Sequence, residues 1–156
     1  MRKYYKNKIK DFLRKTLRLK VKPWRIALSL ALGVFIGLAV PIGFQTIIAT
    51  PIALLLQCNL PITLTATLVS NPVTVVPLYF FYFRLGEFLT KIQISTELIS
   101  QALDTPTFHN ISQLSGDAIL LFFVGSVLVG VTGGVITYFT SYRLIVWYRH
   151  KRGLNI

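Results

Sequence analysis

The polar residues that could do chemistry lie at three interruptions of a long apolar run. From residue 26 to residue 83 the sequence has no charged side chain, yet proline, glycine, asparagine and glutamine divide it into short segments. Proline favours the first turn of a helix, and asparagine is a preferred residue just before that turn. Each interruption therefore predicts the end of one helix and the start of another. The candidate site residues are Pro41, Gly43, Gln45 and Thr46, then Asn59 and Pro61, and then Ser70, Asn71, Pro72 and Thr74.

The third interruption gives the most specific prediction. One helix should end near Ser70, and the next should begin at Pro72. The Asn71 side chain should accept hydrogen bonds from the backbone amides of Val73 or Thr74. Helix N-termini carry partial positive charge, and transporters direct the ends of broken helices at anionic substrates. Two interpretations follow: a site for an anionic molecule, or a structural device that locks a helical hairpin.

No enzyme chemistry is indicated. The charge-free run has no carboxylate pair, histidine cluster or nucleophile with a base, and His109 and His150 fall in a loop and a basic tail. The single cysteine, Cys58, excludes an internal disulfide and a cysteine-based metal site. Proton-coupled transport would lack a titratable carrier. We therefore expect no catalytic residue, no cofactor and no metal ion.

The distribution of charge predicts an all-α integral membrane protein. The chain has 17 Lys and Arg against 5 Asp and Glu, a net charge of +12, and these basic residues gather at its two ends. Helices are expected in the membrane domain 24–142, at 24–40, 44–57, 62–89 and 117–142, with an interfacial helix at 92–104. Several segments are shorter than the roughly 30 Å hydrocarbon layer, which predicts broken or re-entrant half-helices.

The same charges predict topology and location. Basic termini favour the cytoplasmic face, so both termini should lie there in a bacterial inner membrane, with an even number of crossings. Four crossings satisfy this condition, and so do two crossings with residues 26–57 as a re-entrant hairpin. An organelle membrane is the alternative location, because the basic, acid-poor start also resembles a transit peptide.

The two basic ends predict contact with anionic lipid headgroups. Residues 1–23 are expected to form an amphipathic interfacial helix, with Lys8, Lys15 and Arg18 facing the headgroups and Trp24 at their level. A solvated basic segment is the alternative. Residues 143–156 are expected to form a basic C-terminal tail. Nucleic acid is not an expected partner, because a membrane surface explains the same charges.

Small residues predict close helix contacts. Gly33 and Gly37 are spaced by one helical turn, as are Gly130 and Gly134, with Ser126 one further turn away. Such faces let two helices approach closely in a membrane. The contacts are expected inside one chain, or alternatively between copies in a homo-oligomer.

The ordered motifs resemble those of domain-of-unknown-function family 2062, a family of prokaryotic membrane proteins. The resemblance covers about residues 10 to 140, and its motifs are Gly33-x-x-x-Gly37, Pro41-x-Gly43-x-Gln45-Thr46, Asn59-x-Pro61, Ser70-Asn71-Pro72-x-Thr74, Pro77-x-Tyr79 and Leu85-Gly86. The family has no established activity. Some of its members are fused to glycosyltransferase domains, which implies work near lipid-linked sugars. Two functions are therefore expected: translocation of lipid-linked or small anionic molecules, or a non-catalytic subunit or scaffold of a larger membrane complex.

Overall fold

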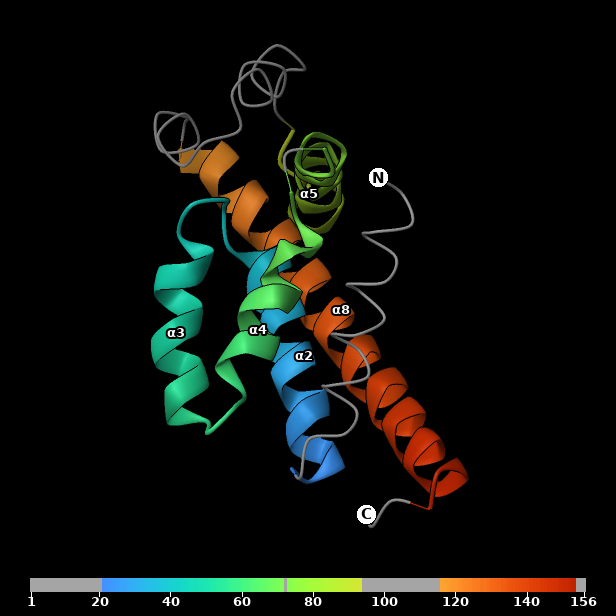
Figure 1. Cartoon of the computed structure of the whole chain (residues 1–156). Coiled ribbons are helices and arrows are strands. Elements are labelled where there is room, and N and C mark those ends of the chain that lie inside the picture. Colours follow the sequence, from blue (N-terminus) through green and yellow to red (C-terminus); the bar gives the residue numbers. More distant parts are fainter. Residues whose placement is uncertain (1–20, 72, 94–115, 154–156) are drawn as a thin grey trace.

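The structure, a computed structural model, describes residues 21–71, 73–93 and 116–153. The described residues form helices and connections and contain no strand. The elements are α2 (Pro23–Ala39), α3 (Gln45–Leu55), α4 (Leu60–Ala66), the 3-10 helix η1 (Thr67–Val69), α5 (Val75–Thr90) and α8 (Gly116–Lys151) (Figure 1). The predicted all-α class is therefore confirmed for this part of the chain.

One described helix, α8, is long and apolar enough to cross a membrane. Its 36 residues extend over about 54 Å, against roughly 30 Å for the hydrocarbon layer. The apolar helices α2, α3 and α4 with η1 are shorter. The number of crossings therefore stays a prediction.

Most predicted segments correspond to helices, with one extension. The segments 24–40 and 44–57 correspond to α2 and α3, and 62–89 divides into α4, η1 and α5. The segment 143–156, predicted as a tail, is instead helical through Lys151, because Ile145 and Arg149 are buried and hold the last turns in the bundle. Gly153 follows with φ at +61°, a left-handed conformation common just after a helix.

Two predicted elements fall largely outside the described residues. The basic helix of 1–23 is described only from residue 21, so Lys8, Lys15 and Arg18 are not placed. The interfacial helix of 92–104 is described only at Ile92 and Gln93, which are not helical. Both elements stay predictions.

The centre of the bundle is the antiparallel pair α2 and α8, which lie side by side in Figure 1. A Cβ added at Gly130 would lie 2.9 Å from the Ala39 Cβ, and one at Gly134 would lie 3.2 Å from the Phe35 Cβ. The small-residue face of α8 thus packs against α2 within one chain.

The opposite side of α2 packs against α4 and η1. A Cβ added at Gly33 would lie 2.3 Å from the Thr63 carbonyl oxygen, and one at Gly37 would lie 2.7 Å from the Thr67 carbonyl oxygen. No side chain fits between backbones this close. Glycine at these two positions therefore allows α4 and η1 to run alongside α2.

The helix α5 crosses the first half of α8, and it is seen nearly end-on in Figure 1. At the crossing, a Cβ at Gly86 would meet the Leu121 backbone at 2.3 Å, and a Cβ at Gly125 would meet the Tyr82 backbone at 2.1 Å. The Phe122 ring packs edge-on against the Tyr79 ring, with centroids 4.7 Å apart. This reciprocal glycine contact and its aromatic cluster fix α5 on α8.

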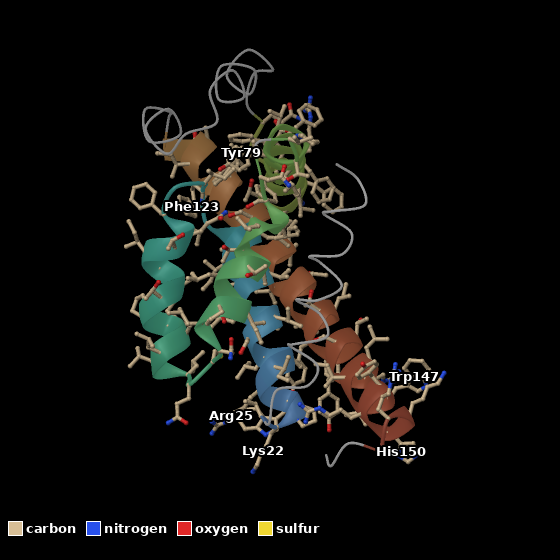
Figure 2. The ribbon with its side chains drawn as sticks, in the orientation of Figure 1. Lys22, Arg25, Tyr79, Phe123, Trp147 and His150 are labelled. Carbon is tan, nitrogen blue, oxygen red and sulfur yellow. The ribbon has the colours of Figure 1, made fainter. Side chains whose placement is uncertain are left out.

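The start of α2 and the end of α8 lie together at one end of the bundle. The buried Arg149 guanidinium near the end of α8 donates a hydrogen bond of 2.8 Å to the Val21 carbonyl, just before α2. Figure 2 shows Lys22, Arg25, Trp147 and His150 at this end, and Tyr79 and Phe123 at the other. The basic residues that flank α2 and α8 therefore gather on one side of the molecule.

The outer surface of the bundle is rich in apolar side chains. Leu55 on α3 is 82% exposed and Phe139 on α8 is 60% exposed, and many other large apolar residues are exposed beside them. An apolar surface of this extent is typical of contact with lipid or with another protein.

Candidate functional site

The candidate site is built around the C-terminal end of α2. The last carbonyls of a helix lack amide donors from their own helix. In α2 the Ile36 carbonyl still accepts from the Val40 amide, but Pro41 has no N–H to offer the Gly37 carbonyl. The carbonyls of residues 37 to 40 therefore need donors from elsewhere. Four side chains supply them, and they come from three helices and one connection.

Gln45, the first residue of α3, provides the central contact. Its side-chain Nε2 donates to the Gly37 oxygen at 2.9 Å, to the Val40 oxygen at 3.1 Å and to the Ser70 Oγ at 2.6 Å. The Ser70 Oγ in turn donates to the Gly37 oxygen. Both side chains are buried. The α2 end, the α3 start and the connection before α5 are thus joined through one amide and one hydroxyl.

Two further donors reach the same helix end from the other side. The Tyr82 hydroxyl of α5 donates to the Leu38 oxygen at 2.7 Å, and the Ser126 hydroxyl of α8 donates to the Ala39 oxygen at 3.3 Å. The Tyr79 hydroxyl accepts a hydrogen bond of 3.3 Å from the Ile42 amide in the following turn. Every carbonyl from residue 37 to residue 40 consequently has a side-chain donor.

The Asn71 side chain closes the start of α5 in the predicted way. Its Oδ1 accepts from the Val73 amide at 2.9 Å and from the Thr74 amide at 3.2 Å. The Thr74 Oγ1 accepts in return from the Asn71 amide at 3.0 Å. The regular helix begins at Val75, three residues after the predicted start, because residues 73 and 74 form a turn first. Pro72 is not among the described residues.

A second asparagine cap lies at the opposite end of the bundle. The Asn59 Oδ1 accepts from the Ile62 amide at 3.2 Å at the start of α4, and Pro61 occupies the first turn. The Asn59 amide donates to the buried Ser29 hydroxyl of α2 at 2.7 Å. Asn59 and Pro61 therefore form a separate structural point, remote from Gln45 and Ser70.

The remaining predicted residues do not gather into one polar cavity. Thr46 is exposed, although its neighbour Gln45 is buried. Pro41 is buried and ends α2, and Gly43 has φ at +103°, which only glycine adopts readily. Pro41 and Gly43 thus shape the turn that returns the chain into α3.

Sequence reasoning gave no structural role to several residues that join the helices. Tyr82, Ser29 and Gly125 were not singled out, and Tyr79 and Gly86 were named only as parts of the motifs Pro77-x-Tyr79 and Leu85-Gly86. In the structure the three hydroxyls of Tyr79, Tyr82 and Ser29 form hydrogen bonds between helices or their connections, and Gly86 and Gly125 form the crossing of α5 and α8. A signal existed for the tyrosines, because a buried tyrosine hydroxyl in an apolar segment needs a hydrogen-bond partner. The partner itself was not predictable from spacing.

The geometry suits hydrogen bonding of side chains to the free backbone groups at helix ends. It does not suit the binding of an anion. Backbone carbonyls, at the partially negative end of α2, face the cluster. The nearby amides of Val73 and Thr74 are already used by Asn71. Among the described residues, no group of His, Cys, Asp and Glu is placed to hold a metal ion. The arrangement therefore joins four elements at one point and has no evident reactive group.

A family described as "Uncharacterized protein conserved in bacteria (DUF2062)" matches residues 6–153, nearly the whole chain. No curated protein and no solved structure matches the chain.

Proposed function

The chain belongs to this bacterial family, and we propose that it is an integral inner-membrane protein that serves as a non-catalytic subunit or scaffold of a larger membrane complex. The observation that carries the proposal is the use of the polar side chains at the helix breaks. Gln45, Ser70 and Ser126 are buried and bonded to the carbonyls of α2. They hold the bundle together and do not face an aqueous path.

The surface supports placement in a membrane. The outer side chains of α3 and α8 are apolar over a large area. The basic residues at the start of α2 and at the end of α8 lie at one end of the bundle (Figure 2), and Trp24 and Trp147 belong to these same helix ends. Aromatic and basic residues together are typical of the cytoplasmic interface. We therefore place the start of α2 and the end of α8 on the cytoplasmic side, next to anionic headgroups.

The length and the exposed apolar side chains of α3 favour contact with a partner protein. Its 11 residues reach about 16 Å, so it cannot cross the hydrocarbon layer alone. Ile47, Leu54 and Leu55 are strongly exposed on it. A half-helix inside a bilayer is stable only when its open backbone ends are covered by protein or reach water. A partner against this outer face would supply that cover.

Translocation of lipid-linked or small anionic molecules is the other function that the sequence indicates. Translocation requires polar side chains that line a path for the substrate through the bundle. Asn71 is half-buried, but its acceptor is used at the start of α5. We therefore give the scaffold role precedence.

The test places a photo-reactive amino acid at Leu55, which is 82% exposed, and in a second variant at Ala53, which is fully buried. The full chain is expressed in bacterial cells and irradiated in intact membranes. We expect the protein to resist alkaline carbonate extraction, and the residue at position 55 to crosslink to one other protein in near-stoichiometric yield. The variant at position 53 should give no such product. Extraction by carbonate would contradict the membrane placement. Crosslinks to lipid alone, together with substrate movement by the purified chain in vesicles, would contradict the scaffold role.

A further inference from the structure

The last turns of α8 carry a cationic and aromatic face that the cluster at the α2 end does not involve. Trp147, Tyr148, Lys151 and Arg152 line a shallow cavity of about 410 Å³. The Lys151 Nζ lies 5.2 Å from the centre of the Trp147 ring, and the Arg152 Cζ lies 5.8 Å from the centre of the Tyr148 ring. The two rings hold two cations side by side at the edge of one cavity, because cations are attracted to aromatic faces at this distance.

We propose that this cavity binds the phosphate headgroup of an anionic phospholipid. The proposal rests on the membrane placement given above, because the lipid must reach the cavity from the bilayer. It assigns a defined binding site to α8, separate from the basic N-terminal segment.

The order of side chains along α8 matches a phospholipid that stands parallel to the helix. Leu144 is 57% exposed and Trp147 is 61% exposed, and Lys151 is exposed one turn later. Residues three, four and seven positions apart share a helix face, and Leu144 and Lys151 are about 10 Å apart along the axis. An apolar residue, an aromatic ring and a cation thus follow one another, as do the acyl chain, the ester region and the phosphate of a lipid.

The charge around the cavity favours an anion. His150 and the buried Arg149 lie in the same turns of α8, and Lys22 and Arg25 lie at the same end of the bundle (Figure 2). The acidic side chains among the described residues are Glu87 on α5 and Asp117 at the start of α8, at the opposite end (Figure 1). The carbonyls at the end of α8 contribute only about half a negative charge, which the two cations outweigh.

Two tryptophans are present, so Trp24→Phe leaves Trp147 as the one fluorescent reporter at the cavity. The full-length variant is reconstituted in phosphatidylcholine vesicles that contain an equal fraction of lipid brominated near the headgroup. The brominated lipid is either phosphatidylglycerol or phosphatidylcholine. We expect brominated phosphatidylglycerol to quench Trp147 more strongly, because it is enriched at the cavity.

The charge-removing variant is Lys151→Gln with Arg152→Gln in the same background. Each basic residue near an anionic surface contributes a preference of about fivefold, so the apparent preference for phosphatidylglycerol should fall roughly fivefold for each cation removed. The matched control, Lys22→Gln with Arg143→Gln, also removes two charges but leaves the four lining residues intact. This control loses only the general attraction of basic residues to an anionic surface, so it should lose clearly less of the preference than the variant with Lys151→Gln and Arg152→Gln.

The outcomes separate this proposal from the proposed function. Equal quenching by the two brominated lipids would overturn the headgroup site and leave the membrane placement intact. Quenching by neither lipid would overturn the membrane placement itself. An equal loss in the control variant would show general surface attraction and overturn the site. Relief of the quenching by soluble glycerol phosphate would show a site for free phosphate esters, and that result would overturn the assignment to a lipid.

Discussion

Replacement of Gln45 by leucine should weaken the bundle at the point where α2, α3 and the connection before α5 meet. The substitution removes the Nε2 donor and keeps a side chain of similar size. The Gly37 oxygen would still accept from the Ser70 hydroxyl. The Val40 oxygen, however, would lose its side-chain donor, because Gln45 is the residue that reaches it.

The expected magnitude follows from the carbonyl that is left without a partner. A fully buried acceptor without a partner costs about 1–3 kcal/mol. The Val40 oxygen is part-buried, so its cost lies toward the lower end of this range, and the lost contact to Ser70 adds to it. The leucine side chain offsets part of the loss through its apolar contacts, at roughly 25 cal/mol for each Å² that it buries. We therefore expect the free energy of unfolding to fall by about 1–2 kcal/mol.

The measurement is reversible unfolding of the full chain in mixed detergent micelles, followed by helical circular dichroism as the denaturing detergent increases. Thr46→Val is the matched control, because Thr46 is the next residue, is exposed, and contributes its carbonyl rather than its side chain to the hydrogen bond from Thr50. It should leave the midpoint almost unchanged. If Gln45→Leu, Thr46→Val and the unaltered chain have the same unfolding midpoint, the cluster does not stabilise the helix break, and the structural interpretation of Gln45 is wrong.

Three further predictions use the same unfolding assay or side-specific labelling. Gly125→Ala should lower the free energy of unfolding by about 1–3 kcal/mol, because the added Cβ would lie 2.1 Å from the Tyr82 backbone oxygen. The control, Gly116→Ala, should be neutral or stabilising, because its Cβ would have nothing within 4 Å. Equal effects of the two substitutions would contradict the close crossing of α5 and α8. Asn71→Leu should lower the free energy of unfolding by about 1 kcal/mol, because the cap is lost. Asn71→Asp should lower it much less, and this variant should still form the crosslinked complex. A stable Asn71→Asp variant that loses all function would instead favour an anion site. In a Cys58→Ser background, an impermeant maleimide should label a cysteine at position 153 from the cytoplasmic side and one at position 93 from the other side; labelling of both from one side would exclude the proposed topology.

The local parts of the candidate site were predictable from the sequence. The contact of Asn71 with the amides of Val73 and Thr74 depends on residues two and three positions away, so the general rule for helix caps is sufficient. The same rule applies to Asn59 and the Ile62 amide. The prediction for Asn71 holds because a cap is a property of one turn of chain.

The partners of Gln45 and Tyr82 were not predictable in this way. The Gln45 amide bonds to Ser70, which is 25 positions away, and the Tyr82 hydroxyl bonds to Leu38, which is 44 positions away. These contacts depend on how whole helices pack. Gly125 was missed and Gly86 was given no packing role for a related reason, because neither has a second glycine one turn away on its helix. Gly130 and Gly134 are one turn apart on α8, and this repeated spacing allowed their packing face to be predicted from the sequence.

The helix contacts also bear on how the chain fits a bilayer. The Gln45 side chain ties the start of α3 to the end of α2, and the Asn59 amide returns the chain to the level of Ser29. From there α4 and η1 run back along α2 until Ser70 reaches Gly37. Residues 45–70 therefore run away from the C-terminal end of α2 and return to it, so the chain leaves α4 and η1 at the same end of α2 from which α3 began.

The turn between α3 and α4 lies beside the first turns of α2. The Asn59 amide contacts Ser29, six residues after the first residue of α2, and the Gln57 side chain accepts a hydrogen bond of 3.2 Å from the Arg25 guanidinium, two residues after it. A hairpin of this kind would be re-entrant in a membrane, and α8 is the one described helix that is long and apolar enough to cross the membrane by itself. The sequence predicted four crossings, or two crossings with a re-entrant hairpin at 26–57. In the described residues the hairpin that turns back beside α2 is formed by α3 and α4. The Arg149 contact with Val21 holds the start of α2 and the end of α8 together, and this arrangement is the one that the predicted even number of crossings requires.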